Sequence, residues 1–367
     1  LHTPAIFDIA SKGAYGRAYT GGEIGGYSQT PTISAVGYTN LLTSTWFNKH
    51  NVGGNSNLKP NYNYWTLFRI AKEQPQPCKT AIYSSWTDNR TVLLGEGKEE
   101  TNRLEIDIVK DGYDLDTICF PHKEKELHVF DYDEKVSLEA SKSIREDAPD
   151  LSWVYLWYTD DAGHIAGNGA FFDEYVRKAD EQVARIWEAV KYREANFDEE
   201  WMVVITTDHG RTENGYGHGG QSLRERTTWI STNLPVNDYF KSGRLAITDI
   251  APSVCRFMGF EVPRDVLWEQ DGMPFIGKVD ICGLRTSPYD RSVELSWDCI
   301  SEKNEVTVYV ACDNKFKTGR TDEWIKVATV PAAVCKYRVD LTSLPKSDFY
   351  KFVLVTPNNH LNRWLKR

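Results

Sequence analysis

WMVVITTDHGRTENGYGH, residues 201–218, is the stretch that decides the predicted fold and site. Its apolar run, residues 202–205, has the length and β-branched character of a strand buried on both faces. Asp208 and His209 follow at the carboxyl end of that strand, where ligands gather in open α/β sheets, and His218 comes nine residues later in a glycine-rich loop. Carboxylate and imidazole are ligands of zinc and similar divalent ions. Taken alone, the stretch also fits a strand end with a solvated loop.

A second stretch has the same form. Residues 151–158 are strand-like and continue into TDDAGH, which contains Asp160 and His164. The two residues are four apart, so one helical turn can direct both side chains at one point. An ordinary loop acid beside a structural histidine is the alternative. Two strand ends with Asp and His, together with His218, favour one metal site or two adjacent sites.

Size and charge limit the classes of protein to consider. The 367 residues suffice for one large and one small domain, and 41% hydrophobic with 26% charged residues is ordinary for a globular protein. A net charge of −9 gives no electrostatic basis for binding duplex nucleic acid or an anionic membrane. No apolar run approaches the roughly 20 residues that cross a bilayer. Seven cysteines without close pairs argue against a complete disulfide framework, and Asn89-Arg90-Thr91 fits a glycosylation sequon.

Ser34 is the candidate nucleophile. It stands in PTISAVGYTNLLT, where a strand-to-helix transition is expected and where backbone N–H groups favour an anion such as phosphate. A serine in this position is either a helix N-cap or a nucleophile. A neighbouring metal site favours the second role, because a metal stabilises the alkoxide.

Strands and helices alternate through the first three quarters of the chain, which predicts an α/β fold: a mostly parallel sheet with helices on both faces. The sequence predicts a strand over residues 79–84 and an irregular insertion over residues 96–125. Helices are predicted over residues 3–13, 61–73, 134–148 and 171–193, and from residue 248 to near Gly259.

The pattern changes after about Gly277. Short strands separated by turns are expected at residues 291–297, 305–311, 324–330 and 350–356, as in a small β-sandwich. Leu344 followed by Tyr350 resembles the tyrosine corner of a fibronectin type III domain. We expect a catalytic domain over residues 1–277 and a fibronectin type III-like domain over residues 284–367.

Residues 1 to about 275 resemble the alkaline phosphatase superfamily, on the branch of the nucleotide pyrophosphatase/phosphodiesterases. Three stretches carry the resemblance in the same order: PTISAVGYTNLLTSTWFNKHNV, TDDAGH, and TTDHG followed by GHGG. The resemblance implies two Zn²⁺ ions and a serine nucleophile, Ser34. It implies that one ion binds to Asp160, His164 and His218, and the other to Asp208 and His209.

Two positions depart from the pattern of the family. The aspartate of the family's first strand would precede the helix at residues 3–13, and the sequence begins too late to include it. The family is also expected to place an asparagine three residues after the nucleophile, where this chain has Gly37. Arginines near His218 are the alternative holders of phosphoryl oxygens, since guanidinium binds phosphate in a bidentate manner. They are Arg211, Arg224 and Arg226.

The function implied is a two-metal phosphoryl hydrolase. It would act on a small organic, possibly nucleotide, phosphodiester through a phosphoseryl intermediate. A phosphomonoesterase with the same site and a catalytically incomplete cell-surface binding protein are the two alternatives. The absence of an initial Met indicates processing or truncation, and a secreted, periplasmic or cell-surface location is expected.

Overall fold

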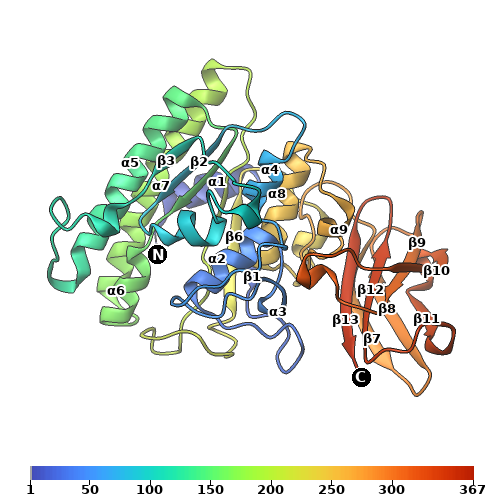
Figure 1. The fold of residues 1–367 in the computed structure, drawn as a ribbon. Coiled ribbons are helices and arrows are strands. Elements are labelled where there is room, and N and C mark those ends of the chain that lie inside the picture. Colours follow the sequence, from blue (N-terminus) through green and yellow to red (C-terminus); the bar gives the residue numbers. More distant parts are fainter. Residues whose placement is uncertain (1) are drawn as a thin grey trace.

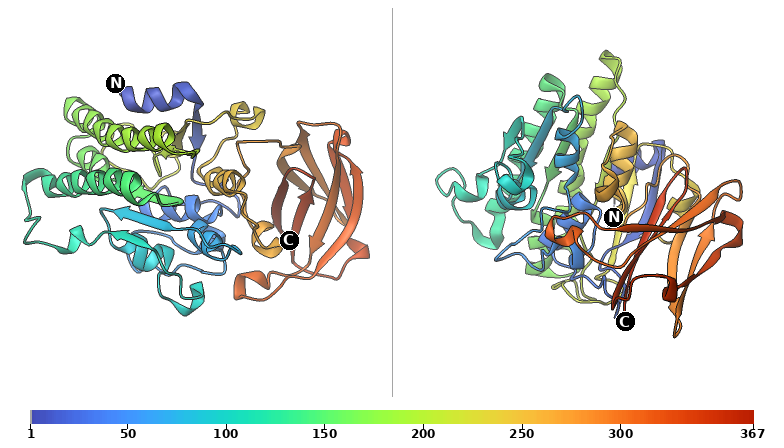
Figure 2. Two further views of the ribbon diagram at one scale, coloured as in Figure 1. Left: turned by 90° about the horizontal axis from the view of Figure 1, so that it is seen from above. Right: turned by 45° about the vertical axis from the view of Figure 1, so that its right-hand side comes forward.

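A computed structural model describes residues 2–367. The chain forms a larger α/β part and a smaller all-β part that lies beside it (Figure 1). Viewed from above, the long helices of the larger part lie in layers over its strands (Figure 2). No helix within residues 2–367 combines the length and the apolar character that a membrane crossing requires.

A parallel three-stranded sheet forms one half of the α/β part, with β2 (Thr80–Ser84) between β3 (Ile108–Lys110) and β4 (Leu151–Tyr155). Both faces of β2 are buried. Ile82 packs with α2 (Ser34–Thr43), α4 (Leu67–Lys72) and α8 (Ile250–Met258). Ala81 and Tyr83 face α5 (Leu127–Asp147) and α7 (Ala170–Asn196). The prediction of helices on both faces of a parallel sheet is confirmed for this half.

The other half is antiparallel, and here the prediction of a mostly parallel sheet is wrong. Its strands β1 (Ala14–Tyr19), β6 (Thr227–Thr232) and β5 (Val204–Thr206) pair in the order β1-β6-β5. A loop rather than a crossover helix joins β5 to β6, and a loop connection permits antiparallel pairing.

β5 also differs from the buried strand that its apolar sequence predicts. It has three residues and is only partly buried. Within residues 2–367 it pairs with β6 alone, just as β4 pairs with β2 alone. Ile186 of α7 belongs to one hydrophobic cluster with Ile205 of β5 and to another with Val154 of β4. The two sheets therefore share a helical layer, and β4 and β5 are edge strands of their sheets.

Most predicted helices form, with shifted ends. α1 (Pro4–Lys12), α7 and α8 match their predicted ranges, whereas α5 begins at Leu127 instead of residue 134. The helix predicted over residues 61–73 forms only as α4, because the Thr66 side chain accepts a hydrogen bond from the Arg69 N–H and caps the helix there. The sequon is not a glycosylation acceptor in this fold, because Asn89 is fully buried and donates to Ser84 Oγ at 3.0 Å.

The all-β part consists of two antiparallel sheets whose inner faces share one hydrophobic cluster. Trp297, Val308 and Phe352 are members of this cluster and are at most 1% exposed. Four of the strands were expected, and three were not. The sheets have the orders β10-β9-β12-β13 and β11-β8-β7, with the bounds β7 Ile281–Pro288, β8 Ser292–Cys299, β9 Glu305–Ala311, β10 Trp324–Pro331, β11 Lys336–Asp340, β12 Phe349–Val355 and β13 His360–Lys366.

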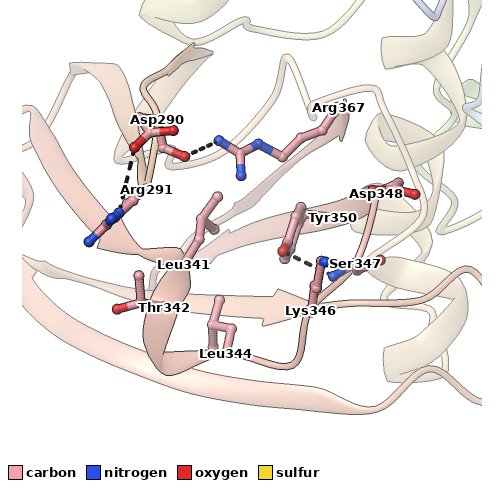
Figure 3. A pocket seen from close by; sticks show the side chains of 10 residues that line it. All are labelled: Asp290, Arg291, Leu341, Thr342, Leu344, Lys346, Ser347, Asp348, Tyr350 and Arg367. Carbon is pink, nitrogen blue, oxygen red and sulfur yellow. Dashed lines mark hydrogen bonds and ion pairs between the residues drawn. The ribbon is translucent and has the colours of Figure 1, made fainter.

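Tyr350 makes the contact expected of a tyrosine corner. Its hydroxyl accepts a hydrogen bond from the Ser347 N–H at 3.2 Å (Figure 3). The same figure shows the shallow pocket of about 470 Å³ that Tyr350 and Leu344 help to line. The chain between β11 and β12 is therefore fixed to the sheet at this point.

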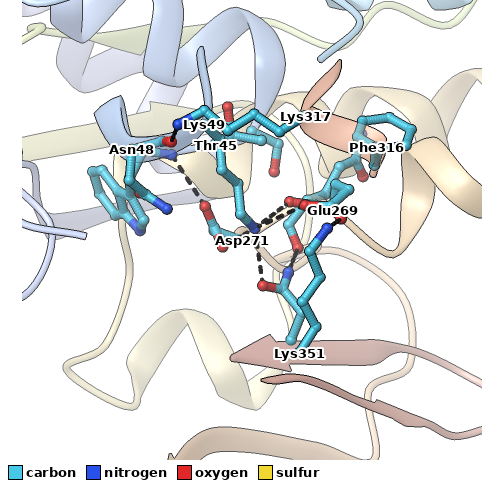
Figure 4. Close-up of polar contacts among 12 residues, drawn as sticks. Thr45, Asn48, Lys49, Glu269, Asp271, Phe316, Lys317 and Lys351 are labelled. Carbon is cyan, nitrogen blue, oxygen red and sulfur yellow. Dashed lines mark hydrogen bonds and ion pairs between the residues drawn. The ribbon is translucent and has the colours of Figure 1, made fainter. Parts of the chain in front are cut away.

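A buried ionic network joins the two parts (Figure 4). Lys49 of α3 (Phe47–His50) donates to Asp271 Oδ1 at 2.7 Å and to Asn362 Oδ1 of β13 at 2.9 Å. Lys351 of β12 pairs with Glu269 and with Asp322, the latter at 2.6 Å. The two lysine side chains are 0% and 2% exposed. The nucleophile helix α2 immediately precedes α3 in the chain, so this network also fixes the region behind the candidate site.

Candidate active site and metal centre

Ser34 is the first residue of α2 and is buried, with 9% of its surface exposed. Its Oγ lies 3.4 Å from His209 Nε2. The preceding residue, Ile33, supplies no side-chain cap to the helix. Instead the Ala35 N–H donates to the side-chain oxygen of Asn55 at 2.9 Å. Asn55 lies in an exposed loop beside Ser34, and the sequence reasoning missed it.

Gly37 brings α2 close to Asp208, in the loop after β5. A Cβ added at Gly37 would lie 2.7 Å from the Asp208 carbonyl oxygen and 2.8 Å from Asp208 Cβ. Such distances are shorter than van der Waals contact, so position 37 has no room for any side chain. The glycine that departs from the family pattern is therefore a packing requirement of this site.

Three histidines have their Nδ1 atoms directed at backbone carbonyl oxygens. His164 Nδ1 lies 2.7 Å from Tyr216 O, His218 Nδ1 lies 3.0 Å from Thr32 O, and His209 Nδ1 lies 2.9 Å from Gly210 O. A carbonyl oxygen can only accept, so each Nδ1 carries the proton and each Nε2 keeps a lone pair. This is the arrangement in which a protein holds histidines as metal ligands.

The free Nε2 atoms converge on one carboxylate. Asp160 Oδ2 lies 3.2 Å from His164 Nε2 and 3.7 Å from His218 Nε2. The two Nε2 atoms lie 3.1 Å apart, and the ring of His209 stacks on that of His218 with centroids 3.9 Å apart. Two facing lone pairs at this distance repel unless they share a cation. The donor set therefore fits a divalent ion.

Asp160 and Asp208 respond differently to burial. Burial opposes ionisation of Asp160, but its contacts with His164 and His218 and the charge of Arg211 outweigh burial and hold the pKa of Asp160 well below its usual range. Burial also raises the pKa of Asp208, and the neighbouring His209 offsets only part of that rise. A cation bound between the two carboxylates would compensate both for the loss of water.

The three candidate arginines have other partners. Arg211 pairs with Asp160 and donates to Gly215 O at 2.6 Å, so it fixes the position of the Asp160 carboxylate. Arg224 donates to Asn168 Oδ1 at 2.6 Å, and Arg226 donates to Gly22 O. Their contacts place Arg211 at the predicted ligand cluster and place Arg224 and Arg226 in the surrounding loops.

Asp133 is a second residue that the sequence reasoning missed. It is 2% exposed, and its carboxylate accepts from the N–H groups of Trp157 and Tyr158 at 2.8 and 2.7 Å. These groups begin α6 (Tyr158–Ala166), the helix that presents Asp160 and His164. Burial raises the pKa of Asp133 to about 7. Nothing in its neighbourhood of sequence resembles a motif, so only the fold reveals this role.

The fold is mixed α/β, with helices on both faces of a parallel sheet, as in alkaline phosphatase-like proteins. The family model described as Type I phosphodiesterase / nucleotide pyrophosphatase matches residues 21–253. The chain belongs to this family. The match covers the regions of all three site stretches.

Other comparisons are distant. Phosphonoacetate hydrolase from Sinorhizobium meliloti, solved with phosphonoformate, is 17% identical over 57% of this chain and 50% of its own, with a TM-score of 0.38. A pectate lyase from Pectobacterium carotovorum is 22% identical over 24% of this chain and 26% of its own, with a TM-score of 0.17. The chain thus spans a quarter to a half of these structures, and at such scores neither adds to the argument. No curated protein matches the chain.

Proposed function

We propose that the chain is a metal-dependent phosphoryl hydrolase with Ser34 as its nucleophile. The observation that carries the proposal is the convergence of three Nε2 lone pairs and Asp160 beside the Ser34 hydroxyl. Membership of the phosphodiesterase family supports the reaction class. Asp160, His164 and His218 would hold one ion, and Asp208 and His209 the other, with zinc the best match to imidazole and carboxylate ligands. Bound ions of this kind lower the pKa of a hydroxyl and stabilise charge on the oxygens of the transition state.

The residues of the chain then have separate tasks. The Ser34 Oγ forms a bond to phosphorus while the bond to the leaving oxygen breaks, and water later cleaves the phosphoseryl ester. Asn55 has a side-chain amide N–H₂ without a hydrogen-bond partner within residues 2–367, because only its oxygen is engaged, by Ala35. We propose that this amide donates to a phosphoryl oxygen, the task that the family pattern had suggested for position 37. Arg211 would keep Asp160 oriented, and Arg224 and Arg226 remain candidates for contact with the substrate.

The proposed substrate is an organic, possibly nucleotide, phosphodiester. Two aromatic residues of this region, Trp46 and Tyr158, are buried at 6% and 1% exposure and serve packing. Tyr38 donates to the Tyr155 hydroxyl at 2.8 Å, so it too is engaged. Tyr216 is 49% exposed, and its carbonyl oxygen binds His164. Its ring is therefore the free aromatic face beside the site, suited to the second substituent of a diester.

The substrate class can be tested by measuring kcat/KM for a bis-aryl phosphate, the matching aryl monophosphate and an aryl sulfate, with zinc supplied. We expect the diester to have the highest value and the sulfate the lowest. A higher value for the monoester would contradict the diester assignment and leave the phosphoryl hydrolase intact. Absence of hydrolysis of all three esters by a zinc-loaded protein would contradict the proposed function itself.

Asn55→Ala should reduce kcat/KM for the preferred ester by about 10²-fold, the effect of removing one donor to transition-state charge. The fold should persist, because Asn55 is exposed. Asn57, an exposed residue of the same loop, gives the matched control Asn57→Ala. Equal kinetics of the Asn55 and Asn57 variants would show that Asn55 does not contact the phosphoryl group.

Gly37→Ala should lower kcat/KM by at least about tenfold, since shifts of about 1 Å in a catalytic group cost up to two orders of magnitude. The added Cβ must displace either α2, which carries Ser34, or Asp208. Gly54→Ala is the control, because a Cβ at Gly54 meets nothing within 4 Å. Wild-type kinetics for Gly37→Ala, with a normal melting temperature, would refute the packing argument.

For the all-β part we propose a fibronectin type III-like domain over residues 284–367. Its support is the pair of antiparallel sheets with a common core and the hydrogen bond at Tyr350. The contacts of Lys49 and Lys351 suggest a role in supporting the catalytic part.

A further inference from the structure

A second group of metal-binding residues lies outside the candidate active site. The imidazoles of His122 and His128 and the carboxylate of Glu126 have ligand atoms that all lie within 4.8 Å of one another. They belong to the turn that leads into α5, with His128 on the first helical turn. His122 and Glu126 are exposed, whereas His128 is 4% exposed.

The contacts of the three residues are few. The rings of His122 and His128 meet edge to face with centroids 4.5 Å apart, and Glu126 Oε2 lies 3.5 Å from His128 Nε2. The Lys123 N–H makes a long, 3.3 Å contact with His128 Nδ1. Within residues 2–367 the His122 imidazole forms no hydrogen bond or ion pair.

The backbone takes an unusual path to bring Glu126 to the histidines. Lys125 and Glu126 are consecutive non-glycine residues in the left-handed region, with φ of 55° and 52°. This conformation is disfavoured for any residue with a Cβ. The Tyr158 hydroxyl fixes the turn by donating to Lys125 O at 2.6 Å. Tyr158 begins α6, so the turn is attached to the helix that carries Asp160 and His164.

We propose that His122, Glu126 and His128 bind one divalent cation of the zinc class, separate from the ions of the active site. Two imidazole nitrogens and one carboxylate oxygen are a common ligand set for Zn²⁺, with water completing the coordination. Coordination through His128 Nε2, the atom that faces Glu126, moves the ring proton to Nδ1 and breaks the weak contact with Lys123. The ion would hold the strained turn against α5 and thereby support α6.

The test uses the full chain, loaded with Zn²⁺, freed of excess metal and analysed for metal content. The variant His122→Ala/Glu126→Gln changes only exposed side chains, and Glu124→Gln is the control in the same turn. We expect the double variant to hold about one Zn²⁺ fewer per chain than the wild type and the control. Its affinity for that ion should be at least about tenfold lower. Removal of a residue that only hydrogen-bonds to a metal ligand already lowers metal affinity roughly 10- to 100-fold. Equal metal content in wild type and double variant would overturn the proposal.

A second measurement covers the case in which the variant does not fold. In NMR spectra of the wild-type chain titrated with Zn²⁺, the imidazole proton signals of His122 and His128 should shift together. They should shift at one equivalent of Zn²⁺ beyond the equivalents that shift the signals of His164 and His218. Signals of His122 and His128 that do not respond to Zn²⁺ would overturn the proposal. Loss of the same ion by the Glu124→Gln control would also overturn it, because that result indicates surface adsorption.

Discussion

Ser34→Ala should lower the turnover of phosphate esters by roughly three orders of magnitude or more, because the covalent route through the serine oxygen is lost. The loss should be in kcat, since the proposed metal ligands and Asn55 remain. Ser34 contacts the cluster only at His209 Nε2, at 3.4 Å, so removal of its hydroxyl leaves the other contacts of the site intact. Steady-state kinetics measures the loss in kcat, and analysis of the metal content shows whether the proposed metal ligands still bind.

Ser56→Ala, at an exposed position in the loop that carries Asn55, is the matched control and should behave as the wild type. Incubation of the wild-type protein with substrate, followed by acid quenching, should trap phosphate on Ser34. A Ser34→Ala protein that retains near-parental turnover would show that water attacks the ester directly.

Lys351→Met should destabilise the whole chain by about 3–5 kcal/mol, the cost of breaking a buried ion pair by removal of one partner. The substitution leaves Asp322, which is 5% exposed, without its counter-charge, and leaves Glu269, which is 2% exposed, with only the longer ion pair to Lys49. Lys49 replaces Lys351 only in part, because it pairs with Glu269 at 3.7 Å and, within residues 2–367, forms no ion pair with Asp322. Urea denaturation followed by tryptophan fluorescence measures the change in the free energy of unfolding.

Lys326→Met is the control for this experiment. Lys326 is an exposed residue of β10, and its replacement should change the free energy of unfolding by no more than about 0.5 kcal/mol. The triple variant Lys351→Met/Glu269→Gln/Asp322→Asn should recover part of the loss, because no unpaired charge remains. Similar stabilities for Lys351→Met and Lys326→Met would mean that the network contributes nothing to the junction.

The sequence indicated which Asp and His side chains lie close together, because each predicted pair is local. One helical turn separates Asp160 from His164, and one peptide bond joins Asp208 to His209, so the members of each pair lie close together. The strand ends indicate where the two pairs meet. The supporting contacts could not be predicted, because they join distant segments. His218 depends on the carbonyl of Thr32, 186 residues away, and Ala35 depends on Asn55.

The errors in the fold have physical causes of the same kind. An apolar run such as residues 202–205 predicts burial, but not which neighbour pairs with it or in which direction. β13, HLNRWLK, was missed because a polar edge strand lacks the alternation that marks a half-buried one. Its Asn362 and Trp364 instead face Lys49, a contact that only the assembled chain creates.

One hydrophobic cluster extends without interruption from the α/β part into the all-β part, with Trp46 and Ile230 on one side and Trp297 and Phe352 on the other. Two parts that share a core cannot lose it separately. We therefore expect a single cooperative thermal transition, with a calorimetric enthalpy that equals the van't Hoff enthalpy, in place of two independent meltings. Excision of the all-β part would expose the shared core, so we expect that the α/β part does not fold on its own.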